Sequence, residues 1–203
     1  MGVEMEFESA TPSIVRAIKQ RDLLNTWLRL FAKTAQVPRR EEFRPERIED
    51  EIPDLVFLRV EYGAEPPRFI IESDGARPAD ALGSAGAGRY LDEYLGPVLA
   101  AQSVPVYLAC CAKGRPAYTI SMVDDVNGCS VDYERLLLPF WDGERVSSII
   151  ASLKTISEDG GFQNRNLLRG NTRPPTLKLR SIIDRDLVHR MPGRYAPGDV
   201  IES

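Results

Sequence analysis

The sequence predicts an α+β domain, and two features of the chain support that prediction. An amphipathic stretch near the N-terminus has apolar residues three or four positions apart, which is the period of a helix. Further along, five segments rich in β-branched and aromatic residues are typical of strands, and a helical stretch separates the first two from the last three. We therefore expect one sheet interrupted by helices, in a chain of 203 residues that is long enough to bury a sizeable core.

The first element is an amphipathic helix expected over Ser13–Ala35. Burying each large side chain of its apolar stripe is worth about 1.5–3 kcal/mol, so the stripe must be covered. A helix of about 22 residues spans roughly 33 Å, more than a small domain is expected to cover, so part of the stripe should meet a second copy in an isologous homodimer. A helix folded flat on its own domain is the alternative. The interface candidates are Ile14, Ile18, Leu24, Trp27, Leu28 and Phe31.

The following segments are expected to build the sheet and its helices. A charged connector with several prolines extends to Asp54 and has room for one short helix. The strands "LVFLRVEYG" and "RFIIES" then form a hairpin, and short helical pieces broken by glycines and prolines fill 74–113. Three more strands are expected in "PAYTISMVDD", "CSVDYERLLLPFW" and "ERVSSIIASLKTI", separated by the turn signals "VNG" and "WDGE".

The chain after Ile156 has a different composition, in which glycines, prolines and charges break up the apolar pattern. We expect an irregular tail in which the piece "LKLRSIIDRDLV" docks as a strand or short helix. The predicted division is therefore an N-terminal helix and connector over 1–54, a sheet domain over 55–156 and a C-terminal tail over 157–203.

Three short motifs connect this chain to a known family. They are "VPRREEFRPERI" (Val37–Ile48), "GAGRYLDEYL" (Gly86–Leu95) and "DYERLLLPFWDG" (Asp132–Gly143). With them the chain resembles a family of small bacterial PAS-like proteins, which carry a proline–arginine stretch after an N-terminal helix, a helix start of the GRxLDE kind and a YxRLLLP strand. The order and spacing of the motifs match from about Leu23 to Ile156.

The resemblance implies a PAS-like five-stranded antiparallel sheet with helices on one face, and a pocket for a small ligand between the two layers. The pocket candidates are Tyr107, Tyr118, Ile120, Met122 and Arg135, and the apolar members of this set can equally be ordinary core residues. A Gly-Thr step is expected after the second strand, but here Ala76 follows Gly75, so no threonine hydroxyl can contact a ligand at that point.

Alternation along the last motif predicts a strand covered on both faces. Leu136, Leu138 and Phe140 fall on one face, and Tyr133, Arg135 and Leu137 fall on the other. The domain's own helices are expected to cover one face and the N-terminal helix the other. Arg135 has two interpretations: it is a cation for an acidic ligand, or it pairs with a carboxylate such as a glutamate of the connector.

Several classes of chemistry are disfavoured by the residues present. The only histidine, His189, lies in the tail, so a haem has no axial ligand in the domain, and no cysteine stands in the Asn-Cys-Arg setting of a flavin photosensor. The three cysteines lack paired CxxC spacing, and the loop "GSAGAGR" lacks the features of a nucleotide-binding loop. We therefore predict no haem, flavin or metal, and no catalytic residues.

The partners and compartment follow from charge and composition. A net charge of −4 argues against a broad nucleic-acid surface, and we expect no membrane span or signal peptide, which places the protein in the cytoplasm. The 47 residues after Ile156 are too few for a kinase, cyclase or DNA-binding module. The prediction is a PAS-fold sensory or regulatory protein that acts on a separate signalling protein, with or without a small ligand. The alternative is a small-molecule enzyme that uses the same cavity.

Overall fold

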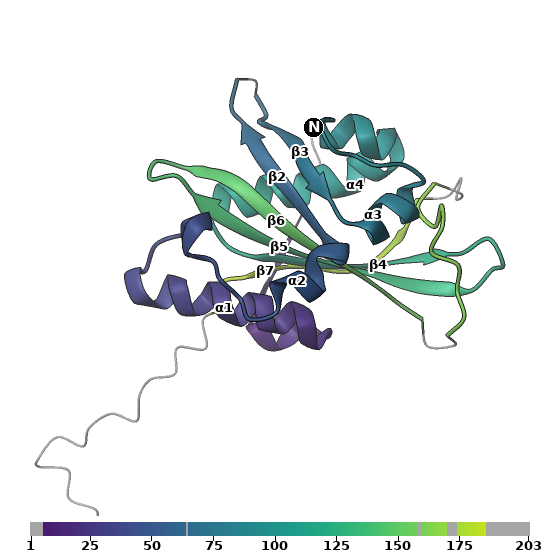
Figure 1. Cartoon of the computed structure of the whole chain (residues 1–203), viewed down its shortest axis with the longest axis horizontal. Helices are drawn as coiled ribbons and strands as arrows, with labels where there is room; N and C mark the ends of the chain where they lie inside the picture. The colour runs from purple at the N-terminus through teal and green to yellow at the C-terminus, as the bar shows by residue number, and fades with distance from the viewer. Residues whose placement is uncertain (1–5, 64, 158–159, 170–173, 186–203) are drawn as a thin grey trace, which may run out of the picture.

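Seven strands form one mixed sheet in the computed structural model, which describes residues 6–63, 65–157, 160–169 and 174–185 (Figure 1). The strand order is β1-β7-β4-β5-β6-β2-β3, and all neighbours are antiparallel except the parallel pair β1 and β7. The strands are β1 (Glu8–Ala10), β2 (Leu55–Glu61), β3 (Arg68–Asp74), β4 (Ala117–Asp124), β5 (Ser130–Trp141), β6 (Val146–Ile156) and β7 (Thr176–Ile183). The helices are α1 (Ile18–Thr34), α2 (Ile48–Glu51), α3 (Ala76–Leu82) and α4 (Leu91–Lys113), with single 3-10 turns at Pro12–Ile14, Arg40–Glu42 and Ile52–Asp54.

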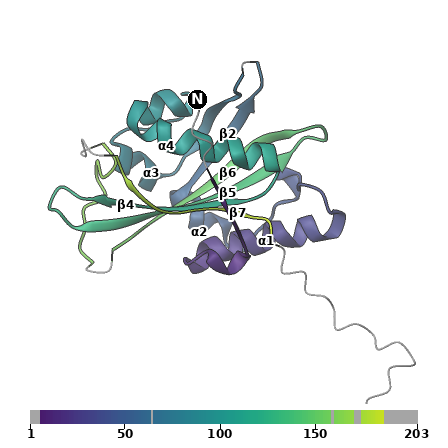
Figure 2. The same ribbon diagram turned by 180° about the vertical axis from the view of Figure 1, so that it is seen from behind.

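The α+β class is confirmed, but the expected sheet of five antiparallel strands is wrong. Two strands come from the segments outside 55–156: β1 has only three residues, which is too short for a periodic signal, and β7 lies in the segment whose composition indicated a tail. The piece expected to dock there does so as the strand β7, between β1 and β4. The helices also occupy both faces, because α3 and α4 cover one and α1 covers the other (Figures 1 and 2).

The strand β5 lies near the middle of this sheet and separates two hydrophobic cores. Leu137 belongs to the core under α3 and α4, whereas Leu136 and Leu138 belong to the core under α1. All three leucines are fully buried, at 0% exposure. The prediction that this strand is covered on both faces, by the domain's helices and by the N-terminal helix, is therefore confirmed.

The helix α1 is shorter than expected, since it begins at Ile18 and ends at Thr34, where Ala35 caps it in the left-handed conformation. Its 17 residues span only about 26 Å, which the sheet can cover. The indole Nε1 of Trp27 donates a hydrogen bond to the carbonyl oxygen of Pro139 at 2.7 Å, and Gln20 Nε2 donates one to Ser152 O at 2.9 Å. Because both donors are fully buried, these bonds add to the apolar contacts that hold α1 on the sheet.

The connector after α1 is attached to the sheet by a buried cluster of charges. The ammonium group of Lys154, on β6, pairs with Glu51 at 2.8 Å and also with Asp54. The side chains of Lys154, Glu51 and Asp54 are only 13%, 7% and 2% exposed. Lys19 also pairs with Glu51 and Arg77 with Asp54, so Lys154 and these two outer cations together compensate two carboxylates that would be costly to bury alone.

Asp125 lies in the turn between β4 and β5 and connects this hairpin to the loop after β6. Its side chain is buried, with the residue 6% exposed. Its carboxylate accepts backbone N–H bonds from Gln163 at 2.9 Å and from Asn127 and Cys129 at 2.8 Å. These bonds, that of Gln163 first, lower the pKa of Asp125. The ionised carboxylate is therefore part of the folded structure.

The helix α4 crosses the opposite face of the sheet from α1 and carries no charged side chain between Glu93 and Lys113. A kink at Gly96, with φ at 72°, divides it near its start. By length and composition α4 is apolar enough to span a membrane, whereas no membrane span was expected from the sequence. Its inner side packs on the sheet, however, and the core helix of a globular protein can have the same composition.

Candidate functional site

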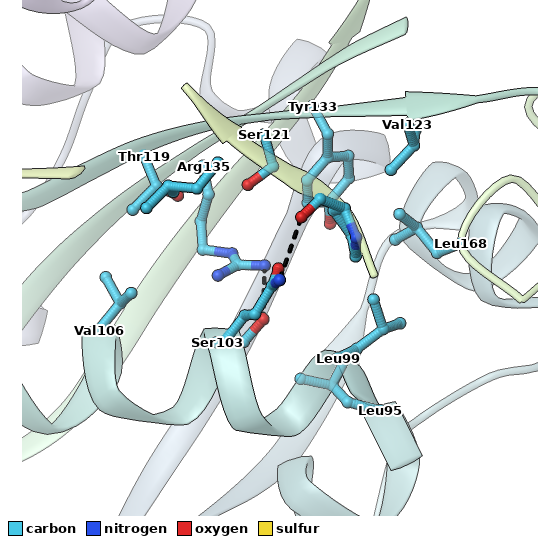
Figure 3. Close-up of a pocket in the computed structure, with 13 residues that line it drawn as sticks. Leu95, Leu99, Ser103, Val106, Thr119, Ser121, Val123, Tyr133, Arg135 and Leu168 are labelled. Atoms are coloured by element: carbon cyan, nitrogen blue, oxygen red, sulfur yellow. Dashed lines mark hydrogen bonds between the residues drawn. The ribbon is translucent and has the colours of Figure 1, made fainter. Parts of the chain in front are cut away.

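The candidate ligand site is a cavity between α4 and the strands β4, β5 and β7 (Figure 3). Its volume is about 30 Å³, enough for a water molecule or for one end of a small ligand. Leu177 is 41% exposed and marks the side on which the cavity reaches the surface. The polar lining consists of Gln102 and Ser103 from α4, Thr119 and Ser121 from β4, and Tyr133 and Arg135 from β5.

Arg135 is the central charged group of this cavity. Its side chain rises from β5 toward α4, where Nη2 donates a hydrogen bond to Ser103 Oγ at 3.0 Å (Figure 3). Its Nε atom is buried and has no hydrogen-bond partner among the described residues. The rings of Tyr107 and Tyr133 each lie with their centres 5.7 Å from the guanidinium carbon.

The described part of the chain contains no carboxylate within ion-pair distance of Arg135. Of the two interpretations of this residue, pairing with a glutamate of the connector is therefore not observed among those residues. A buried N–H without a partner is unfavourable, and a cation without a counterion is more so. The Nε–H group of Arg135 is thus a hydrogen-bond donor beside the cavity with no acceptor among the described residues.

The two tyrosines near Arg135 are neutral hydrogen-bonding groups. Burial raises the pKa of Tyr133, while the nearby guanidinium of Arg135 acts in the opposite direction with a smaller effect. Burial raises the pKa of Tyr107 in the same way. At neutral pH both phenols therefore keep their protons, and neither can serve as a base.

The predicted pocket residues fall on two sides of the sheet. Arg135 lines the cavity, and Tyr107 lies beside it, with its ring 5.4 Å from that of Phe69. Tyr118 and Ile120 instead belong to the core under α1, and alternation along β4 places Met122 on that same face. These three residues are not brought together with Arg135.

The residues that sequence reasoning missed are the alternate positions of β4. Thr119 and Ser121 line the cavity, and they lie directly opposite Arg135 and Tyr133 on β5. The pocket was expected on the side of the apolar residues Tyr118, Ile120 and Met122, whereas the alternate, polar side chains of β4 line the cavity. The available signal was two hydroxyl residues at a spacing of two on a strand that is otherwise apolar.

The predicted dimer residues are largely buried inside one chain. Leu24 and Trp27 are fully buried under the sheet, and Ile14, Leu28 and Phe31 are partly buried against the same core. Only Ile18 is well exposed, at 68%. The reason given for a dimer through α1, a stripe wider than the sheet, therefore does not apply, because α1 is shorter than expected. The homodimer itself stays a prediction.

A second polar cluster lies on the α1 face of β5. The fully buried carboxylate of Glu134 accepts hydrogen bonds from Arg16 Nε and from the Tyr118 hydroxyl, both at 2.6 Å. Asp132 pairs with Arg16 at 2.9 Å and with Lys178 at 2.5 Å. Burial alone would raise the pKa of Asp132, but the hydrogen bonds from Lys178 and Arg16 lower it overall. Every charge in this cluster is compensated, which is typical of a structural network.

The remaining candidate groups do not form a catalytic or metal centre. Cys110, Cys111 and Cys129 are free thiols, and burial raises the pKa of Cys111 to about 12. Within the described ranges there is no group of three or more His, Cys, Asp or Glu side chains that could hold a metal ion. The glycine-rich segment connects α3 to α4, and His189 lies outside the described residues.

Comparison of the chain with protein-family models, with curated proteins and with solved structures gave no match.

Proposed function

We propose that this protein is a cytoplasmic PAS-like sensory or regulatory domain that binds a small anionic ligand beside Arg135 and acts on a separate signalling protein. The observation that carries the proposal is the Arg135 guanidinium, which lies in a cavity with a buried Nε donor and, among the described residues, no carboxylate partner. An anion entering the cavity would supply the missing counterion.

The arrangement of the central strands supports the PAS-like part of this proposal. The strands β2 to β6 are consecutive neighbours in the order β4-β5-β6-β2-β3, and all of their pairings are antiparallel. The helices α3 and α4 lie between β3 and β4 in the chain, so the strands are split two and three. This is the element order that the resemblance implies, with β1 and β7 added beyond β4.

The composition of the cavity favours a binding role over catalysis. The described residues that line it include no Asp, Glu, His, Cys or Lys. General acid–base catalysis needs a group with a pKa near the working pH, and the raised pKa of Tyr133 moves that phenol away from it. One guanidinium surrounded by hydroxyls can hold and orient an anion, which is what a sensor requires.

The strand β5 offers a route from the bound ligand to the rest of the protein. Arg135 faces the cavity, and its neighbour Glu134 faces the other side of the sheet, where it bonds Arg16 just before α1. A ligand that binds two arrangements of β5 with different affinity would shift the position of the N-terminal segment. A partner protein that binds the N-terminal segment could respond to this shift.

Calorimetric titration of the full chain with small anions tests the proposed function. The expected result is saturable binding by the wild-type protein that is lost in Arg135→Gln. Arg21→Gln is the matched control, because Arg21 is exposed on the opposite side of the sheet. We also expect the unliganded Arg135→Gln protein to be at least as stable as wild type, because the substitution removes a cation without a counterion. Binding that is equal in both variants would overturn the proposal.

A further inference from the structure

A second arginine, Arg180 on the strand β7, lies on the same face of the sheet, beyond the residues that line the cavity. Thr119 of β4 is paired with Arg135 on one side and with Arg180 on the other. Residues directly opposite each other in antiparallel strands point to the same face, so Arg135, Thr119 and Arg180 form a row on the face that α4 covers. Neighbouring strands are about 4.8 Å apart, so the backbones of the two arginines are separated by roughly 10 Å.

Arg180 shares the unusual features of Arg135. Its Nε atom is also buried and has no hydrogen-bond partner among the described residues, and the described residues place no carboxylate within ion-pair distance of it. Burial lowers the pKa of Arg180, and no acidic neighbour offsets this effect. The guanidinium lies 5.5 Å from the ring centre of Phe7, which packs on the same core.

Two incompletely paired arginines on either side of one threonine repel each other and are costly to keep in the folded protein. A ligand with one negative charge would compensate Arg135 only. A ligand with two carboxylates separated by a short chain could pair with both guanidinium groups, each in the fork geometry that arginine offers to a carboxylate, while its chain passes over Thr119.

We propose that the natural ligand class of this site is a small dicarboxylate, held at one end by Arg135 and at the other by Arg180. This inference rests on the proposed anion-binding function and adds to it the second anchor and the length of the ligand.

The test compares ligands and variants by calorimetric titration of the full chain. The ligands are the monocarboxylates acetate and butyrate, the dicarboxylates malonate, succinate and glutarate, and inorganic phosphate. A charge-assisted hydrogen bond contributes about 1.5–3 kcal/mol, so the best dicarboxylate should bind wild type about 10-fold to 150-fold more tightly than a monocarboxylate of similar length. Arg180→Gln should remove this advantage and leave monocarboxylate binding unchanged, while Arg135→Gln should weaken both.

The outcomes separate this inference from the proposed function. If no anion binds, or if Arg135→Gln binds like wild type, the anion-binding function itself is wrong. If anions bind through Arg135 but Arg180→Gln weakens monocarboxylates and dicarboxylates equally or not at all, the dicarboxylate inference alone is overturned. Preferred binding of phosphate over every dicarboxylate would also overturn it. Thermal melts of both variants check that they fold.

Discussion

Replacing Leu137 or Leu138 with alanine should destabilise the protein by a similar and large amount, although the two side chains point in opposite directions. Leu137 packs under α3 and α4, Leu138 packs under α1, and both are 0% exposed. Each substitution removes three methylene-sized groups, worth about 2.4 kcal/mol at about 0.8 kcal/mol each. The space left behind adds to this, so the expected loss is about 2–5 kcal/mol for each variant.

Urea denaturation followed by circular dichroism measures these losses, provided that the slope of the transition stays the same. Leu177→Ala is the matched control, since Leu177 is 41% exposed on β7 and should change the free energy of unfolding by no more than about 0.5 kcal/mol. If either β5 variant stayed within that limit, the corresponding face of the strand would not be part of a packed core, and the two-sided covering of β5 would be refuted.

Four further outcomes are expected. Lys154→Met should destabilise the fold in urea denaturation by no more than about 3–5 kcal/mol, because the buried carboxylates of Glu51 and Asp54 then keep only the largely exposed Lys19 and Arg77 as partners, whereas Lys113→Met at an exposed position should have little effect. The pKa of Asp125 is lowered in the folded state, so its contribution to the free energy of unfolding is present above about pH 4 and is lost as the pH falls through the folded pKa. Asp125→Asn should flatten this loss of stability at acid pH, and an unchanged pH profile of stability would contradict the prediction. The freshly purified protein should show no Soret or flavin absorption band, and a stoichiometric band would disprove the absence of a chromophore. Light scattering should detect a homodimer, and a monomeric wild-type chain would exclude it.

The sequence predicted the elements whose signal is local. The strands β2 to β6 are rich in β-branched and aromatic residues and the helix α1 has a helical apolar period, and all six elements are present. The strand β1 has three residues, and β7 begins just after a segment rich in charges, glycines and prolines. The strand β1 pairs with β7, and β7 pairs with β4, across long chain distances that no local pattern reports.

The site was predicted only in part for a related reason. Alternation divides β4 correctly into two sets of side chains, but it cannot tell which set faces α4 and which faces α1. Tyr118 and Ile120 have the apolar character expected of a pocket, yet they pack under α1, and the cavity forms on the side of Thr119. Arg135 was predicted because a cation directly before three leucines of a strand stands out in the sequence. Arg180 was missed because its strand was assigned to a tail.

The pairing of β7 with β4 has a consequence for how the protein is made. The ribosome releases β4, β5 and β6 well before Thr176–Ile183, so during synthesis one edge of β4 has no strand beside it. That edge carries unpaired backbone N–H and C=O groups next to buried side chains such as Ala117 and Tyr118, which makes it a template for pairing with another nascent chain. A product that stalls before Thr176 would keep this edge open and would be prone to aggregate. The strand β7 therefore covers an aggregation-prone edge of β4 as well as completing the sheet.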